Sequence, residues 1–262
     1  MCRRGRRLPF GRSGLRARGE AQPMIKALHS SGQAMLVQQR RHELIANNLA
    51  NANTPGFQKL ISRVEQAPLA AVPGQTARSA GLSVSALTST AQGPLESTGN
   101  ALDVALMGEG YFLVETPDGP RLTRDGGFAL GPDGELLHSS GHPVLADGGS
   151  LRIDGQPSIL PDGSLLDSGR AAGRLSIVRP LAGTELRRGG DNLLEAPGGY
   201  EEVPLEEVSV QAGRREGSNV EPLEEMVAMI RAFRSYEMAQ KAAQAADELL
   251  RVAVERVGVL RA

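Results

Sequence analysis

Four histidines are the first residues whose side chains could bind a metal. His138 and His142 lie four residues apart, the spacing that places two imidazoles on one face of a helix for zinc. Gly141 lies between them, in a stretch typical of a β-hairpin. His29 and His42 have no HExxH arrangement and no cysteine nearby. We therefore interpret His138 and His142 as surface turn residues and His29 and His42 as solvent-facing or packing residues, and we predict no metal site and no cofactor.

Nucleophilic catalysis and nucleotide binding also lack a fitting arrangement of residues. No serine occupies a GxSxG elbow, and Cys2, the only cysteine, lies in an N-terminal arm. The segment 108–110 (Gly-Glu-Gly) lacks the third glycine and the following helix of a dinucleotide-binding loop. Asp118 and Asp125 are separated by residues typical of a strand, and we interpret both as turn formers. The sequence predicts that the protein is not an enzyme.

Charge is distributed unevenly along the 262 residues. The formal net charge is -1, but residues 1–23 carry seven arginines and one glutamate, so the rest of the chain is net acidic. An acidic body lacks the electrostatic footprint of a nucleic-acid-binding protein. No segment approaches the ~20 apolar residues of a membrane span, and the arm lacks the apolar stretch of a signal peptide. We predict no nucleic-acid partner, no direct membrane insertion and no cleaved signal peptide.

A helix is expected near the N-terminus, from Ile25 to about Ala50, because apolar residues there recur at spacings compatible with one helical face. The asparagine-rich segment ANNLANANTPGF and its Pro-Gly turn predict that this helix ends near Leu49 to Ala52. Since the helical pattern starts just after Met24, we expect residues 1–23 to be a disordered basic arm or an untranslated segment before the true start.

A second helix is expected from Asn219 to about Gly258, with Ser218 or Asn219 as its N-cap and Pro222 in its first turn. At ~1.5 Å per residue it would reach about 60 Å, so we expect it to project. Its apolar residues recur every three or four positions like a coiled-coil seam. The seam runs through Leu223, Met226, Ile230, Phe233, Tyr236, Ala243, Leu250, Val254 and Val257, and Gln240 and Asp247 interrupt it.

The middle of the chain is typical of an all-β domain, from Leu102 to about Val210, because short alternating runs are separated by glycine-containing turns. Pro-Asp-Gly recurs at 117–119, 132–134 and 161–163. Proline presets φ and glycine takes a positive φ, so each unit predicts a hairpin. We expect an extended connector with one or two strands over residues 61–100.

The predicted fold class is therefore α+β. Residues 24–60 and 211–262 are expected to pack as a coiled-coil-like helical domain, and residues 101–210 to form a β domain rich in hairpins. Neither helix can bury its apolar stripe alone in water, so both ends should be mobile in the monomer and become ordered on assembly. The residues expected at packing surfaces between subunits are Leu28, Met35, Ile45, Asn48, Leu49, Asn51, Pro55, Gly56, Phe57, Asn219, Val220, Met226, Met229, Ile230, Phe233, Tyr236 and Leu250.

Two interpretations are open for Asn47, Asn48, Asn51 and Asn53. Their side chains could satisfy backbone groups where the first helix ends, or they could make polar contacts between subunits.

Segments at opposite ends of the chain resemble the signature of the flagellar rod and hook family. They read ANNLANANTPGFQK at 46–59 and GSNVEPLEEMVAMIRAFRSYEMAQKA at 217–242, and residues 97–130 are similar to the opening of that family's β domain. About two thirds of the chain is covered. The resemblance is closest to the proximal rod branch, FlgF, because the connection from Phe57 to Asp103 is short; the distal rod branch, FlgG, is the alternative.

The resemblance implies a structural subunit of the flagellar basal-body rod, which assembles helically with copies of itself and other rod subunits and transmits torque between motor and hook. It implies export from the cytoplasm through the flagellar type III export apparatus and a place in the periplasm-spanning rod. The terminal helices would line the inner tube, with the β domain outside. A secreted β-rich binding module with a helical stalk is the alternative from another class; it would not share the coupled end motifs.

Overall fold

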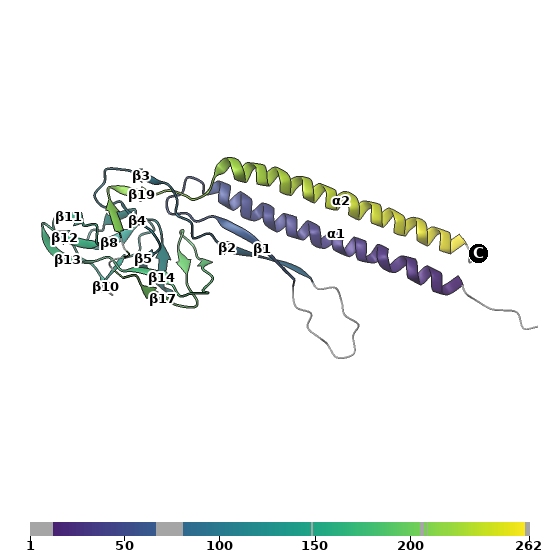
Figure 1. The fold of residues 1–262 in the computed structure, drawn as a ribbon, viewed down its shortest axis with the longest axis horizontal. Coiled ribbons are helices and arrows are strands. Elements are labelled where there is room, and N and C mark those ends of the chain that lie inside the picture. Colours follow the sequence, from purple (N-terminus) through teal and green to yellow (C-terminus); the bar gives the residue numbers. More distant parts are fainter. Residues whose placement is uncertain (1–12, 67–80, 148, 205–206, 208, 260–262) are drawn as a thin grey trace, which may run out of the picture. The chain divides into compact units, whose positions relative to one another are not determined.

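The computed structural model describes residues 13–66, 81–147, 149–204, 207 and 209–259. Along this part of the chain a helix is followed by short strands and then by a second helix (Figure 1). The helices α1 (Ser13–Ala50) and α2 (Pro222–Val259) each contain 38 residues. The α+β class is confirmed. Among the described residues, no helix is long and apolar enough to cross a membrane.

Helix α1 ends where the sequence predicted, at Ala50, but it begins at Ser13 rather than at Ile25. Seven of the nine residues at 14–22 are good helix formers (one leucine, two alanines, two arginines, Glu20 and Gln22), and this local preference does not depend on an apolar stripe. The basic arm expected at 1–23 therefore falls partly within α1, and its first twelve residues lie outside the described residues.

Helix α2 has Pro222 as its first residue, so its expected place in the first turn is confirmed. The predicted N-cap is wrong. The Glu225 amide donates to the Glu221 carbonyl oxygen (3.1 Å), so the helical hydrogen bonding starts at Glu221, after Ser218 and Asn219. Proline is favoured at the first helical position because it has no amide hydrogen to satisfy there.

The chain divides into two compact units. The β unit contains residues 43–63 and 85–228, and the helical unit contains residues 1–42, 64–84 and 229–262. The β unit thus includes the end of α1 and the start of α2, which the sequence had grouped with the helices.

The strand pairs formed by β3 to β19 in the β unit are antiparallel. A six-stranded sheet has the order β15-β16-β6-β5-β14-β17, and a three-stranded sheet has the order β11-β12-β13. Two-stranded sheets are formed by β7 with β8, β9 with β10, β4 with β18, and β3 with β19. The bounds are β3 Leu95–Ser97, β4 Val104–Met107, β5 Tyr111–Thr116, β6 Gly119–Thr123, β7 Phe128–Leu130, β8 Leu136–His138, β9 Leu145–Ala146, β10 Gly149–Ser150, β11 Pro157–Ile159, β12 Ser164–Asp167, β13 Arg170–Arg174, β14 Ile177–Pro180, β15 Arg187–Arg188, β16 Leu194–Glu195, β17 Tyr200–Glu202, β18 Ser209–Ala212 and β19 Arg214–Glu216.

The three Pro-Asp-Gly units do form hairpins, which connect β5 to β6, β7 to β8 and β11 to β12. Gly119, Gly134 and Gly163 all have positive φ, as the turn chemistry requires. In the connector, β1 (Leu60–Gln66) pairs with β2 (Leu82–Thr88), and β3 pairs with β19. The described part of the connector therefore holds three strands rather than one or two.

The core of the β unit consists of two apolar clusters on opposite faces of β5. Phe112 belongs to one cluster and packs edge-to-face against Phe128, with ring centroids 5.1 Å apart. Tyr111 and Leu113 belong to the other. A strand buried on both faces reads as a continuous apolar run, which explains the sequence Tyr-Phe-Leu-Val.

Candidate assembly site at the junction of the two end segments

We call residues 48–60 and 215–225 the junction; all of them belong to the β unit. Asn48, in the last turn of α1, is 1% exposed. Its Nδ2 donates to the Leu60 carbonyl oxygen (2.9 Å) and to Glu225 Oε2 (3.2 Å), and its Oδ1 accepts the Leu60 amide (2.8 Å). One buried amide therefore joins the end of α1, the start of β1 and the first turn of α2.

Glu225 is the charged residue of this contact, and it is 3% exposed. Lys59 Nζ lies 2.6 Å from its second carboxylate oxygen, Oε1. A buried carboxylate is tolerated when both oxygens have partners, and here an ammonium and an amide supply them. The first turn of a helix also favours a negative charge, because the amide dipoles point outward there.

Asn219 joins three segments instead of capping α2. Its Oδ1 accepts the Lys59 amide (2.6 Å), and its Nδ2 donates to the Ala91 carbonyl oxygen (2.7 Å). Its own amide donates to the Phe57 carbonyl oxygen (3.2 Å). The side chain is free for this role because the hydrogen bonding of α2 begins after it.

Gly56 allows two backbones to approach closely. Its φ is +64°, and a Cβ built at this position would lie 2.3 Å from the Asp125 amide nitrogen. Its own amide donates to the Glu216 carbonyl oxygen (2.8 Å). A side chain at residue 56 would therefore meet both backbone strain and a collision.

Asp125 is the centre of a polar cluster beside this contact. Its carboxylate binds Arg215 through Nε (2.9 Å) and Nη2 (3.2 Å), and accepts from Ser139 Oγ (2.9 Å) and from the Gly127 amide (3.0 Å). His138 Nε2 lies 3.5 Å away. Burial raises the pKa of Asp125, but hydrogen bonds from His138 and Arg215 outweigh it and hold the pKa well below its usual range.

The sequence interpretation of Asp125 and His138 needs a correction. Asp125 is not only a turn former, because its carboxylate connects the turn at 124–127 to Arg215 on β19. His138 is not a surface turn residue, because it is the last residue of β8 and is buried, with its Nδ1 2.8 Å from Ser140 Oγ.

A second buried ion pair joins Arg124 to Glu216, with 3.3 Å between Nη1 and Oε2 and both side chains 2% exposed. Glu216 Oε1 also accepts the Gly93 amide (3.0 Å), and Arg124 Nη2 donates to the Gly108 carbonyl oxygen (2.8 Å). Burial raises the pKa of Glu216, although the positive charge of Arg124 opposes that effect.

The residues expected at subunit surfaces fall into three groups by burial. Asn48, Gly56, Phe57 and Val220 are buried, and Asn51 donates to the Asn47 carbonyl oxygen at the end of α1. In contrast, Leu28, Met226, Ile230, Phe233 and Tyr236 are exposed. The remaining members, Met35, Ile45, Leu49, Pro55, Asn219, Met229 and Leu250, are half-buried.

Helix α2 has two opposed faces. Its alanine face, which we define as Ala228, Ala232, Ala239, Ala243, Ala246 and Ala253, is buried or half-buried. At 100° per residue the opposite side carries Leu223, Met226, Ile230 and Phe233, which are 73, 47, 54 and 56% exposed. We call these four residues the apolar stripe. The seam predicted from the sequence mixes the two faces, since it combines the stripe with Ala243 and Leu250.

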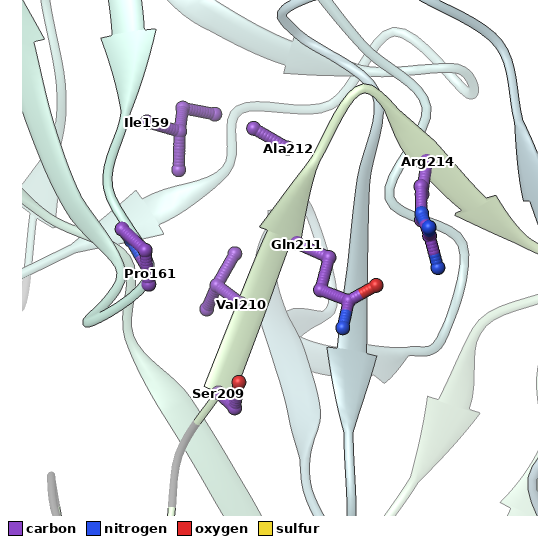
Figure 2. Close-up of a pocket in the computed structure, with 7 residues that line it drawn as sticks. All are labelled: Ile159, Pro161, Ser209, Val210, Gln211, Ala212 and Arg214. Atoms are coloured by element: carbon purple, nitrogen blue, oxygen red, sulfur yellow. The ribbon is translucent and has the colours of Figure 1, made fainter.

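A separate hollow of about 520 Å³ lies along β18 in the β unit (Figure 2). Figure 2 shows Val210 and Ala212 on the same side of the strand as Ile159 and Pro161, with Gln211 on the other side. This arrangement is the ordinary alternation of a strand. The hollow therefore follows from the packing of β18.

Sequence reasoning missed Lys59, Arg215 and Glu216 in the junction, and it also missed Arg124, the partner of Glu216. The partners of these residues lie far away in the chain, as in the pair formed by residues 124 and 216. The spacing of neighbouring residues therefore does not predict these contacts. Charged residues next to apolar strand residues, such as Arg124 after Leu122 and Thr123, were the signal available.

Three family models match the chain. "Flagella basal body rod protein" matches residues 28–58, "Flagellar hook protein FlgE/F/G D1 domain" matches 105–166, and "Flagellar basal body rod FlgEFG protein C-terminal" matches 211–256. The first and last of these contain most of the junction. The matches at both ends cover the coupled end motifs, which a secreted binding module would not share.

Individual relatives align over most of the chain. The flagellar basal-body rod protein FlgF of Caulobacter vibrioides is 35% identical, over 90% of this chain and 99% of its own length. FlgF of Mesorhizobium japonicum is 32% identical (87% and 98%), and FlgG of Borreliella burgdorferi is 34% identical (88% and 98%). This chain therefore belongs to the FlgF/FlgG family of flagellar basal-body rod proteins.

Proposed function

We propose that this protein is a structural subunit of the flagellar basal-body rod, which assembles helically with copies of itself and with other rod subunits and transmits torque between motor and hook. The observation that carries the proposal is the apolar stripe of α2. Four large side chains in succession are exposed there, while the alanines of the opposite face are buried or half-buried.

The stripe is suited to a contact with another subunit. Fully burying a large apolar side chain contributes ~1.5–3 kcal/mol to the free energy of association, so burying the four side chains of the stripe would stabilise a subunit contact substantially. After Phe233 the same side of the helix continues as Glu237, Gln240, Gln244 and Asp247, all exposed. The apolar contact therefore has a defined length along the first half of α2. A head-to-tail contact whose rotation does not close extends such units into a helical rod.

The two helices would pack together in a coiled-coil-like manner. Buried residues recur at coiled-coil spacing in both of them, with Val37 and Leu44 seven residues apart on α1 and Ala232 and Ala246 fourteen apart on α2. Small residues such as these alanines allow a close approach between helices. This packing would leave the apolar stripe to neighbouring subunits.

Within the family, the proposed branch is FlgF. Sequence identity does not separate the branches, since relatives named FlgF and FlgG are 35 and 34% identical to this chain. The support for FlgF is the short connection between Phe57 and Asp103. The proposed location is the periplasm-spanning rod. The proposed route is the flagellar type III export apparatus.

Swimming and basal-body imaging of a strain with Ile230→Asp and Phe233→Asp test the assembly proposal. The matched control carries Gln240→Asp and Gln244→Asp, which add the same two charges to the polar continuation of the stripe. We expect an exported subunit with a folded β unit but truncated rods for the double variant, and normal rods for the control. Normal rods and swimming in the double variant would overturn the assembly role of the stripe.

A further inference from the structure

The hairpin formed by β15 and β16 contacts the junction through its turn. In this turn the Gly189 amide donates to the Leu193 carbonyl oxygen (2.8 Å), and Asp191 and Asn192 both have positive φ. Leu193 and Leu194 are buried and anchor the turn on the β unit. The turn therefore has a defined shape on which side chains can be placed accurately.

Arg188 on β15 covers the aromatic residue of the first end motif. Its guanidinium carbon lies 4.0 Å from the centroid of the Phe57 ring. Its Nη2 donates to the Gln58 carbonyl oxygen (2.6 Å), and its Nη1 donates to Asn192 Oδ1 (3.1 Å). Asn192 then donates from Nδ2 to the Pro55 carbonyl oxygen (2.9 Å). Two side chains of the hairpin thus bind three positions of the motif, 55, 57 and 58.

The environment of Arg188 is unusual for a charged residue. Within the part of the chain that the structure describes, no carboxylate pairs with it; a carbonyl oxygen, an amide oxygen and an aromatic face are its partners. Burial lowers the pKa of Arg188 to about 10. Burying a cation without a counter-charge is unfavourable, so contacts that only this side chain can make must offset it.

The opposite side of the same segment is held by the second end motif. The Gly56 amide donates to the Glu216 carbonyl oxygen, the Phe57 carbonyl oxygen accepts from the Asn219 amide, and the Lys59 amide donates to Asn219 Oδ1. The hairpin and the second end motif therefore use backbone groups of every residue from 55 to 59.

We propose that Arg188 and Asn192 are positioning residues that clamp the Pro55–Lys59 segment against the β unit, so that the residues following α1 have one fixed register. This inference deepens the proposed function, and its importance for the rod rests on that function. The clamp itself is a property of the single chain. It would provide a rigid connection through which force acting on the chain next to α1 reaches the β sheet.

Amide hydrogen exchange of the monomeric full-length chain tests the clamp. In Arg188→Ala we expect the amides of Gly56 and Lys59 to exchange at least about tenfold faster, because two hydrogen bonds to a charged group and a cation–π contact are lost. The amides of β5 and β6 should keep their protection. Arg188→Lys should not restore the wild-type rates, since an ammonium lacks the planar fork and the stacking surface.

The control is Arg187→Ala, the exposed neighbour on the same strand, which should leave every rate unchanged. Asn192→Ala should accelerate exchange at the same amides by a smaller factor, because only the contact to Pro55 and one support of Arg188 are lost. Unchanged exchange at Gly56 and Lys59 in Arg188→Ala would overturn the clamp. Equal acceleration in β5 and β6 would also overturn it, by showing a general loss of stability.

Swimming of the Arg188→Ala strain separates this inference from the proposed function. We expect a folded, exported subunit and impaired swimming. Normal swimming despite faster exchange would overturn the role of the clamp in the rod, while the result for the apolar stripe variants would be unaffected.

Discussion

The junction and the apolar stripe overlap at Leu223 in the sequence, but the polar side chains of the junction have partners within the chain, whereas the apolar side chains of the stripe are exposed. Glu225 is buried and has two partners within the chain, whereas Met226, the next residue, is about half exposed. The side chains of Asn48, Asn219 and Glu225 in the junction find polar partners within one chain. The stripe is apolar and uncovered. A single family motif therefore serves two tasks, one within the subunit and one proposed between subunits.

This difference also concerns order in the monomer. The sequence predicted that both ends become ordered only on assembly, yet the asparagine-rich end of α1 and the start of α2 are bonded to each other inside the β unit. Polar groups in such a network lose their partners if one member leaves, so the network favours a single arrangement. We infer that assembly has to order only the parts of the helices beyond the junction.

The largest effect is expected for Gly56→Val. A Cβ at this position would lie 2.3 Å from the Asp125 amide nitrogen, and φ is +64°. We expect the free energy of unfolding of the β unit to fall by ~3 kcal/mol or more, from collision and strain together. Thermal unfolding followed by circular dichroism measures this.

Gly99→Val is the matched control, since Gly99 also has positive φ (+74°) but no atom within 4 Å of a built Cβ. It reports the backbone strain alone, at ~1–2 kcal/mol. Equal losses in the two variants would contradict the close packing of residue 56 against Asp125.

The next effect is expected for Glu225→Ala, which removes the carboxylate from Lys59 and Asn48. The stability of the β unit should fall by ~2 kcal/mol. This is less than the loss expected for a fully buried pair, because Lys59 is partly exposed to water. Glu224→Ala, at an exposed position of the same turn, should change stability by less than ~0.5 kcal/mol. A similar loss in both variants would show that the loss of stability comes from removing a negative charge near the helix N-terminus and not from breaking the buried contact of Glu225.

The contrast between junction and stripe explains how much the sequence could predict. Local chemistry predicted the hairpins, because Pro-Asp-Gly dictates φ at its own residues, and it placed the end of α1 at its asparagines and proline. It failed at Asn219, whose partners are Lys59 and Ala91 and lie far away in the chain. It also combined both faces of α2 into one seam, because counting apolar positions does not show that alanines face inward and larger residues face outward.

Acid should weaken the junction through Asp125. The pKa of this residue in the folded state lies below its ordinary value of 3.8, so the folded state binds fewer protons than the unfolded state at low pH. Its contribution to stability is complete above about pH 5 and decreases as the pH falls through 3.8. One carboxyl group gives a slope of at most about 1.4 kcal/mol per pH unit.

Denaturant titrations between pH 5 and pH 2 measure this slope in the wild type and in Asp125→Asn. The variant should be less stable at pH 5 and should have a shallower slope. Asp162→Asn is a useful comparison, because hydrogen bonds from Ser164 lower the pKa of Asp162 at a fully exposed site. If Asp125→Asn keeps the full wild-type slope, Asp125 does not cause the sensitivity to acid.

The smallest effect on the monomer is expected at the stripe, where Ile230→Ser should change the free energy of unfolding by less than ~0.5 kcal/mol because the side chain is mostly in water. Ala232→Ser, on the buried alanine face two positions later, places a hydroxyl among apolar contacts and should cost about 1 kcal/mol or more. Swimming should show the reverse order if the stripe contacts neighbouring subunits: Ile230→Ser impairs it more strongly than its effect on stability accounts for. If swimming in both variants follows monomer stability, the large exposed side chains of α2 have no role in assembly. The proposed contrast between a junction with partners inside the chain and a stripe that contacts other subunits would then be wrong.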